Sequence, residues 1–162
     1  HQCDACGSGE NLHNFHGDPR KMRQTIIRGR PPNFERIATV LPAARGKGVI
    51  FSYGDKIYLP DGGTLPHTLL AHEAKHGERQ GTTKESIEAW WDQYLTDPQF
   101  RFLEELEAHR AEYAAYRPGR HGMSRAGLLH VTANRMSGEL YHNMCSYADA
   151  VELIKNEIAV AA

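Results

Sequence analysis

The spacing of apolar and polar positions predicts an α+β chain in which short β-strands come before helices. Two runs, 49–53 and 56–59, read as β-strands, and Gly54-Asp55 between them is typical of a hairpin turn. These runs predict a short antiparallel β-sheet. A short helical stretch is expected upstream, within 21–28, before the break at "RGRPPN".

After these strands the pattern predicts four helices. The first begins at about Thr64 or Pro66 and ends at His76, and the polar loop "GERQGTTKES" follows it. The second holds "ESIEAWWDQYL", and the third extends from 98 to about 116, where a Pro-Gly pair stops it. Ser146 is the expected N-cap of a last helix that ends at about 159, with an inner side formed by Ala148, Val151, Leu153, Ile154 and Ile158.

The length and the charge distribution indicate one folded domain behind a basic arm. At 162 residues, 40% of them hydrophobic, the chain is long enough for one buried core and too short for two comfortable domains. Residues 1–47 hold eight Lys or Arg against four acids, whereas residues 48–162 hold eleven against sixteen. We expect a basic N-terminal arm, 1–34, followed by the folded domain, 35–162. So small a positive excess is more typical of a solvated surface than of a nucleic-acid contact.

The apolar runs and the cysteines indicate the compartment. No run approaches the roughly 18 to 20 apolar residues that span a bilayer, and "HQCDACGSGE" has neither the basic nor the apolar part of a signal peptide. Three cysteines, two of them in a C-x-x-C, suit a reducing compartment and metal binding better than a disulfide framework. We expect a cytoplasmic protein with no membrane partner, and the pattern leaves the oligomeric state open.

The stretch "LLAHEAKHGERQG", 69–81, contains an H-E-x-x-H motif. Residues four apart lie on one face of an α-helix, so His72 and His76 could bind one ion with Glu73 beside it. With ten histidines in the chain, a chance match is expected on the order of a few per cent of the time. The motif also lies beside an apolar helix face, which a solvated helix would lack, formed by Leu65, Leu69, Leu70 and Ala74.

A zinc hydrolase needs a third protein ligand and an open position for water. The third predicted helix offers Glu104, Glu105 and Glu107. Glu104 and Glu107 share a sector in which acids are more often solvated. Glu105 lies in another sector, together with Phe102, Leu106, His109 and Tyr113.

The other interpretation of this helix is an acidic amphipathic helix with no ligand. In that case the acids form local pairs along the helix surface, Glu107 with Arg110 and Glu105 with His109. The H-E-x-x-H motif upstream favours the ligand interpretation.

An H-E-x-x-H helix after a short sheet, followed by a later helix with a glutamate in an E-x-E-A context, resembles the gluzincin branch of zinc peptidases. The ImmA/IrrE-like and minigluzincin-type small enzymes are the most similar, and the match covers roughly residues 48–116. The resemblance implies a helical, zincin-like catalytic core. It also implies that Zn²⁺ is bound by His72, His76 and Glu105, with Glu73 as the general base.

The chain departs from the gluzincin pattern at His109, where an Asp or Asn usually supports a metal ligand. The implied function is hydrolysis of a peptide or protein substrate, in which zinc acidifies a water and Glu73 transfers its proton to the leaving nitrogen. By analogy with zincins, an extended substrate is expected to lie along the run 56–60. The oxyanion needs a donor besides zinc, and the catalytic candidates are His109 and Tyr113, followed by Arg110, His121, Tyr141 and His142.

The stretch "CDACGSGENLHNFH" holds a second set of metal-binding residue types. Cys3 and Cys6 with His13 and His16 could enclose a tetrahedral structural zinc. The stretch also resembles the opening knuckle of HNH-type nucleases, but no second C-x-x-C and no downstream Asn and His set follow it. The alternative to the peptidase is therefore a non-enzymatic, nucleic-acid- or virion-associated binding module with a structural zinc or a degenerate site.

Overall fold

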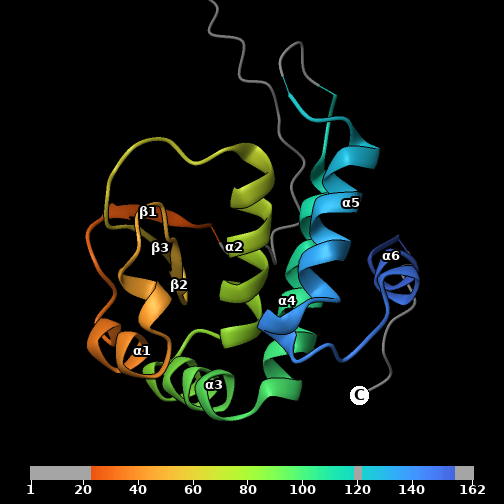
Figure 1. The fold of residues 1–162 in the computed structure, drawn as a ribbon. Helices are drawn as coiled ribbons and strands as arrows, with labels where there is room; N and C mark the ends of the chain where they lie inside the picture. Colours follow the sequence, from red (N-terminus) through yellow and green to blue (C-terminus); the bar gives the residue numbers. More distant parts are fainter. Residues whose placement is uncertain (1–22, 119–121, 156–162) are drawn as a thin grey trace, which may run out of the picture.

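The structure, a computed structural model, describes residues 23–118 and 122–155. Helices and strands follow the chain as predicted for an α+β protein, with a small sheet before most of the helices (Figure 1). With η for a 3₁₀-helix, the elements are β1 (Thr25–Arg28), α1 (Phe34–Val40), η1 (Pro42–Arg45), β2 (Phe51–Tyr53), β3 (Lys56–Leu59), α2 (His67–Gln80), α3 (Lys84–Thr96), α4 (Pro98–Ala115), α5 (Arg125–Met136), η2 (Glu139–Tyr141) and α6 (Tyr147–Lys155).

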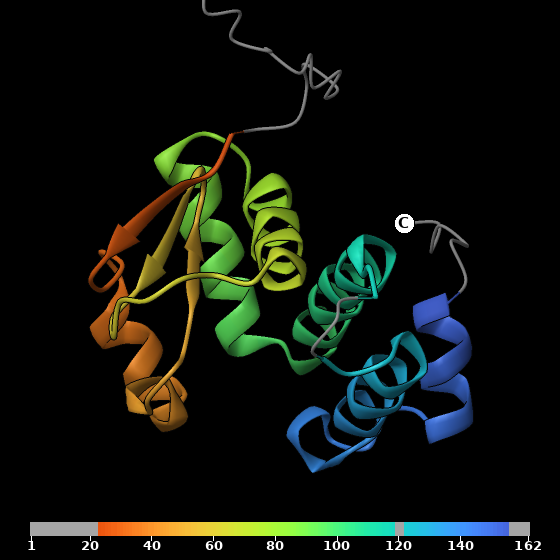
Figure 2. The same ribbon diagram turned by 90° about the horizontal axis from the view of Figure 1, so that it is seen from above.

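The elements are stacked from the sheet toward the C-terminal helices. Figures 1 and 2 show the sheet and α1 at one side, α2 and α3 beside the sheet, and α5 and α6 at the opposite side. α4 lies between these groups and packs along α2 more extensively than any other described pair of elements packs together. The face of α2 that carries the H-E-x-x-H motif is therefore covered by α4.

The sheet is mixed, and this corrects two predictions. Its strand order is β1-β3-β2. β2 pairs antiparallel with β3 as predicted, whereas β1 runs parallel to β3 with Ile26 opposite Ile57. The prediction of a helix within 21–28 is wrong, because Thr25–Arg28 form a strand. The β-branched residues of this segment favour a strand once a sheet edge is present, and the chain passes through α1, η1 and β2 before it reaches β3, which gives the long connection that a parallel pair requires.

β3 is the central strand, which corrects the expected substrate edge. Both edges of β3 are paired, so the run 56–60 has no free backbone groups to add a further strand. β2 is paired with β3 along one edge only among the described strands. The unpaired edge next to α2 therefore belongs to β2.

Part of the predicted N-terminal arm belongs to the folded unit. β1 lies within 1–34, and Phe34 is buried against Phe51, with the two ring centroids 5.6 Å apart. Arg30 covers the Phe34 ring at 4.2 Å from its centroid. The predicted zinc knuckle lies outside the described residues, and its members are Cys3, Cys6, His13 and His16.

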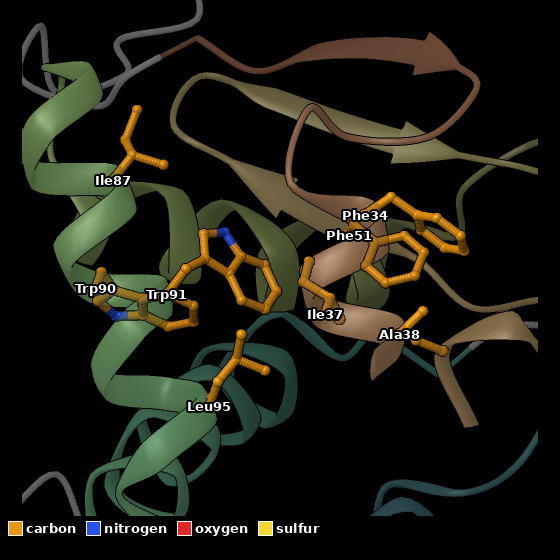
Figure 3. Close-up of a cluster of buried hydrophobic side chains, with 9 residues drawn as sticks. Phe34, Ile37, Ala38, Phe51, Ile87, Trp90, Trp91 and Leu95 are labelled. Carbon is orange, nitrogen blue, oxygen red and sulfur yellow. The ribbon is translucent and has the colours of Figure 1, made fainter. Parts of the chain in front are cut away.

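Two clusters of buried side chains hold the elements together. The first fastens the sheet to α1 and α3 (Figure 3) and contains Phe34, Ile37, Ala38, Ala44, Phe51, Ile87, Trp90, Trp91 and Leu95. The second joins α4 to the C-terminal helices and contains Phe102, Leu106, Ala133, Met136, Tyr141, Ala150 and Ile154. Neither cluster includes the H-E-x-x-H residues, which occupy the α2–α4 interface.

The helix ends follow local signals, with one correction. α2 ends at Gln80 rather than at His76, and α3 begins at Lys84, so most of the predicted polar loop is helical. Gly81 ends α2 with a positive φ of 83°. α4 begins at Pro98 as predicted, and the structure adds an N-cap at Asp97, whose carboxylate accepts hydrogen bonds from the amides of the first turn.

The C-terminal part is only partly anticipated. α1, α5 and both 3₁₀-helices have no counterpart in the prediction. The last helix is confirmed, with Ala150 and Ile154 on its buried side, but Ala148 is exposed and Ile158 lies outside the described residues. Within 23–118 and 122–155, no helix combines the length and the apolar composition needed to cross a bilayer.

A close backbone approach holds α2 against the β2–β3 turn. Gly77 faces the Gly54 carbonyl so closely that a β-carbon at Gly77 would overlap this oxygen. Gln80 adds two hydrogen bonds, since its Oε1 accepts from the Gly54 amide at 2.7 Å and its Nε2 donates to the Ser52 carbonyl at 3.1 Å. These contacts set the rotation of α2 and so the direction of its histidines.

Gly77→Ala is expected to lower the free energy of unfolding by about 1–3 kcal/mol, because a methyl group cannot fit against the Gly54 carbonyl unless helix or turn moves. Urea denaturation followed by circular dichroism measures the change. Gly127→Ala is the matched control, because the added β-carbon meets mainly the flexible side chain of the exposed Met123, and its effect should stay below about 1 kcal/mol. Equal destabilisation by both substitutions would contradict the role of this approach.

Candidate metal centre

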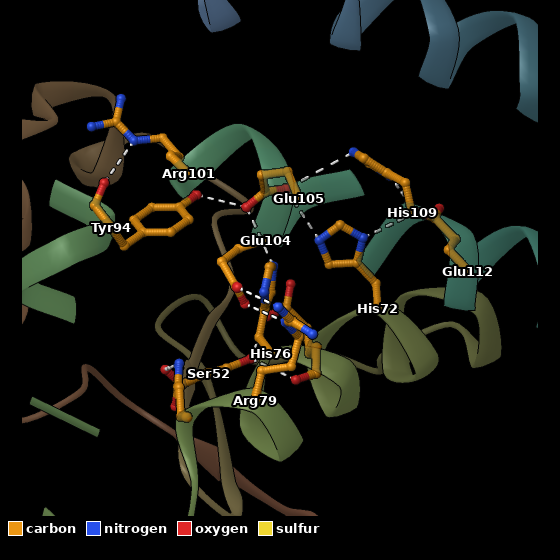
Figure 4. A network of polar contacts seen from close by, with 12 residues as sticks. Ser52, His72, His76, Arg79, Tyr94, Arg101, Glu104, Glu105, His109 and Glu112 are labelled. Atoms are coloured by element: carbon orange, nitrogen blue, oxygen red, sulfur yellow. Dashed lines mark hydrogen bonds and ion pairs between the residues drawn. The ribbon is translucent and has the colours of Figure 1, made fainter. Parts of the chain in front are cut away.

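The three predicted metal ligands meet between α2 and α4 (Figure 4). All three are buried, and the helical spacing of four puts both histidines of α2 opposite Glu105 of α4. Nε2 of His72 lies 3.5 Å from Oε2 of Glu105, and Nε2 of His76 lies 3.3 Å from Oε1. Two ligands of one tetrahedral zinc are about 3.3 Å apart when each bond is about 2.0–2.1 Å. The ligand atoms, all within 4.8 Å of one another, could therefore hold a metal ion.

Glu112, one turn beyond His109, is a site residue that the sequence analysis misses. Its Oε2 lies 3.2 Å from Nδ1 of His72 and 3.0 Å from Nδ1 of His109, and these three residues are also spaced to hold an ion. When His72 binds an ion through Nε2, its Nδ1–H donates to Glu112, as metal-binding histidines usually do to a neighbouring carboxylate. Glu112 thus offers the supporting carboxylate that this chain lacks at position 109, where it has a histidine.

Glu73 is held by a hydroxyl group from the sheet. Ser52 Oγ donates a hydrogen bond to Oε2 of Glu73 at 2.6 Å. The Ser52 hydroxyl oxygen also lies 2.9 Å from the backbone carbonyl oxygen of Glu73. The Ser52 carbonyl accepts hydrogen bonds from Trp91 Nε1 at 3.2 Å and from Gln80. Since Ser52 is buried and its backbone is held from two helices, the position of the Glu73 carboxylate depends on β2.

Two tyrosines surround Glu105. The Tyr94 hydroxyl donates to Oε1 of Glu105 at 2.6 Å. Burial, and then the negative charge of Glu105, raise the pKa of Tyr94 well above its usual value. Burial and Glu105 also raise the pKa of Tyr141. Both phenols therefore stay protonated and remain hydrogen-bond donors.

The centre is strongly anionic. Glu73, Glu105 and Glu112 are buried, and none of them forms an ion pair with Lys or Arg among the described residues. Burial lowers the pKa of His72, but hydrogen bonds to Glu105 and Glu112 outweigh this effect and raise the pKa to about 10. Burial raises the pKa of Glu105, whereas His76 and His72 hold it well below its usual range. Such a cluster needs a cation, either a proton on His72 or a metal ion.

An orphaned ring nitrogen provides a test of whether a metal fits. Burial raises the pKa of Glu112, but hydrogen bonds from His109 and His72 hold it at about 2, so the carboxylate can only accept. His109 therefore donates through Nδ1, and its buried Nε2 keeps a lone pair that faces Oε2 of Glu105 at 3.9 Å without a partner. Two facing acceptors repel each other, and a cation at the cluster removes this repulsion. The donor set fits a metal ion.

Glu104 corrects one expectation about α4. It is 3% exposed rather than solvated. Arg79 donates two hydrogen bonds to its carboxylate, at 2.6 and 2.7 Å, and Trp90 Nε1 donates a third at 2.9 Å. Glu104 therefore ties α4 to α2 and α3. Glu107 forms the predicted pair along the helix, because Arg110 donates a hydrogen bond to its carboxylate at 2.7 Å.

A cleft of about 410 Å³ opens at the centre. It contains the H-E-x-x-H residues and Glu105, so the proposed ligands and the proposed base face one space. Its further lining comes from the residues around β2, from α3 and from the α5–η2 segment, and it includes Val49, Ile50, Phe51, Ser52, Arg135, Leu140 and Tyr141. A space of this volume accommodates part of a peptide or a small ligand.

The structure does not bring most of the predicted oxyanion donors to this cleft. Tyr141 lines it, and His121 lies outside the described residues. Tyr113 packs against the second core cluster instead, with the Arg125 guanidinium 4.2 Å above its ring. Three more candidates are absent from the cleft lining, namely His109, Arg110 and His142. His109 does not face the cleft, and its Nδ1 is hydrogen-bonded to Glu112, which also contacts His72.

Comparison of the chain with known protein families, with curated proteins and with solved structures finds no match. The resemblance to gluzincins stays a prediction that rests on the motif. The arrangement of α2, α4 and β2 therefore carries the functional argument.

Glu105→Ala is expected to weaken Zn²⁺ binding by two or more orders of magnitude, because it removes one of the three candidate ligands. Competition with a chromophoric chelator measures the affinity, and circular dichroism checks the fold. Glu107→Ala is the matched control, since it removes the same charge from the same helix but from a pair with Arg110, and its effect should stay within about twofold. Similar losses in both variants would show that charge alone attracts the ion.

Glu112→Ala is expected to weaken Zn²⁺ binding by about 10–100-fold without removing it, because His72 loses the acceptor that orients its ring. Glu112→Gln keeps a neutral acceptor and should fall between the parent and Glu112→Ala. The same competition assay gives this order. An affinity in Glu112→Ala equal to that of the parent would show that Glu112 does not support the ligand.

Proposed function

We propose that the protein is a zinc-dependent hydrolase of peptide bonds, with Zn²⁺ bound by His72, His76 and Glu105. The supporting observation is that these ligand atoms lie at metal-binding distances in a cleft that also holds Glu73. Two imidazoles and one carboxylate are typical of catalytic zinc and leave a position for water or substrate. Bound zinc supplies an acidified water and polarises an amide carbonyl.

Glu73 serves as the general base and then as the general acid. The Ser52 hydroxyl donates a hydrogen bond to one of its carboxylate oxygens, Oε2. No described residue hydrogen-bonds the other oxygen, Oε1, which is available to take a proton from the attacking water. The same carboxyl group then returns the proton to the departing amine nitrogen. Ser52 keeps Glu73 in place during both transfers.

The edge of β2 is the proposed binding surface for the substrate backbone. Its outer edge has no strand partner among the described residues, and Phe51 and Ser52 line the cleft beside the base. The Ser52 carbonyl already accepts hydrogen bonds from Gln80 and Trp91, so a substrate would pair with the other backbone groups of this edge. An extended peptide that pairs with this edge would pass the ligand cluster. This assignment replaces the run 56–60, because β3 has no free edge.

Tyr141 is the proposed donor to the oxyanion. It is buried at the cleft, and its raised pKa keeps the hydroxyl protonated. A neutral phenol that donates a hydrogen bond stabilises the charge that develops on the carbonyl oxygen. Tyr141 is one of the donors that the sequence offers for this role, and it takes the place of His109 and Tyr113, the first two of those candidates.

The competing function is a binding module in which the metal only joins helices. One observation favours it, because the three ligands are buried and come from two helices, as in a structural site. A structural ion usually has four protein ligands. The group formed by His72, His76 and Glu105 has three candidate ligands and opens into a cleft. Loss of Zn²⁺ would unfold the module, and a peptide would remain intact.

Glu73→Gln is expected to keep about one Zn²⁺ per chain and to lower peptide hydrolysis by at least about 10³-fold, because the amide cannot take the proton. Metal content is measured by mass spectrometry of the protein purified without chelators, and hydrolysis by product analysis of a diverse peptide pool. Glu78→Gln, on an exposed position of the same helix, is the matched control and should keep full activity.

Two results would contradict the proposal. Full hydrolysis by Glu73→Gln would end the assignment of the base. A parent protein that binds Zn²⁺ stoichiometrically and cleaves no peptide in the pool would favour the binding module.

A further inference from the structure

Arg135, in the last turn of α5, is the sole Lys or Arg among the described residues that line the cleft. Its side chain is exposed, and it forms no hydrogen bond or ion pair with any described residue. Glu139, four residues later, does not pair with it. By contrast, Arg79 and Arg110 are both engaged with glutamates of α4. The charge of Arg135 is therefore available to a ligand.

The helix end alone does not explain this arginine. A cation in the last turn of a helix stabilises the helix whichever face the side chain occupies. Arg135 lies on the face that meets the cleft, where the acids that share the lining are Glu73 and Glu105. The guanidinium of Arg135 stays positively charged and is separate from the candidate metal ligands. The cleft therefore has two places that attract an anion, the metal ion and Arg135.

The surroundings of Arg135 favour a carboxylate attached to an apolar group. Arg135 lines the same cleft as Tyr141 and Glu105, so its charge faces the space that contains the candidate metal ligands. Leu140, which is 64% exposed, lies next to Tyr141 in the lining, and Val49 and Ile50 add apolar surface near β2. A guanidinium forms two parallel hydrogen bonds with a carboxylate, which gives direction as well as charge.

We infer that Arg135 binds a carboxylate of the substrate, so that the cleft selects peptides with a negative charge close to the scissile bond. The carboxylate belongs either to an acidic side chain or to the C-terminus of the peptide. This inference rests on the proposed function, because it requires an ion at the ligand cluster and a peptide in the cleft. It adds a substrate class that the H-E-x-x-H motif does not specify.

The first test measures binding without catalysis. The probes are hydroxamates, which bind the metal through their own oxygens, with a terminal carboxylate on an arm of one, two or three methylenes and with the matching uncharged alkyl hydroxamates as references. Binding is followed by the absorption of the Co²⁺-loaded protein. At the best arm length the parent should prefer the carboxylate form by about 10-fold or more. Arg135→Met should abolish this preference and retain affinity for the uncharged form.

Arg125→Met is the matched control for charge. Arg125 is at the start of the same helix, about 15 Å away along its axis by helical rise, and it does not line the cleft. This variant should keep the preference. The inference is overturned if the parent binds no hydroxamate or shows no preference at any arm length. It is also overturned if Arg135→Met keeps the preference, or if Arg125→Met loses it equally.

The second test identifies the source of the carboxylate and separates the inference from the proposed function. Peptides with Glu or Gln at each position are offered in two forms, with a free or an amidated C-terminus. Arg135-dependent cleavage of amidated Glu peptides assigns an acidic side chain, and cleavage of free acids alone assigns the C-terminus. Cleavage that depends on neither overturns the inference and leaves the peptidase intact. A hydroxamate preference that depends on Arg135, without any cleavage, keeps the carboxylate site and removes the peptidase.

Discussion

Three buried carboxylates around α2 have no Lys or Arg partner among the described residues, and the rest of the site is arranged around them. An uncompensated carboxylate in a protein interior costs several kcal/mol, so Glu73, Glu105 and Glu112 require a cation or hydrogen bonds. His72 touches two of them, which is why its pKa rises to about 10 although burial opposes the rise. A divalent ion on the histidines and Glu105 satisfies the same requirement and makes the cluster chemically useful.

β2 connects the core to this charge cluster. Phe51 packs in the first hydrophobic cluster, while Ser52, the next residue, holds the Glu73 carboxylate and accepts hydrogen bonds from Gln80 and Trp91. Adjacent residues of a strand point to opposite faces, so one short strand serves both purposes. The residue that holds the proposed general base, Ser52, and the proposed binding edge are thus parts of one strand.

α4 is shared by two different interfaces. Phe102 and Leu106 enter the C-terminal cluster, whereas Glu105, His109 and Glu112 face α2. Residues separated by four and seven positions share a helix face, so this polar row is a regular feature of α4. Because more than one face of α4 is covered, Glu104 is also buried. The sequence-based prediction assumes a single buried face and therefore places Glu104 in solvent.

The local patterns in the sequence determined the helix of the H-E-x-x-H motif, the start of α4 at Pro98, the β2–β3 hairpin and the inward sector of Glu105, because each depends on spacing along one segment. Glu112 had a signal, seven residues after Glu105, but an acid at that spacing is also typical of a solvated face. Only tertiary structure decided the parallel pairing of β1, the contact of Ser52 with Glu73, and the place of Arg135 in the cleft. These depend on which faces of distant segments meet, and neither spacing nor propensity within one segment contains that information.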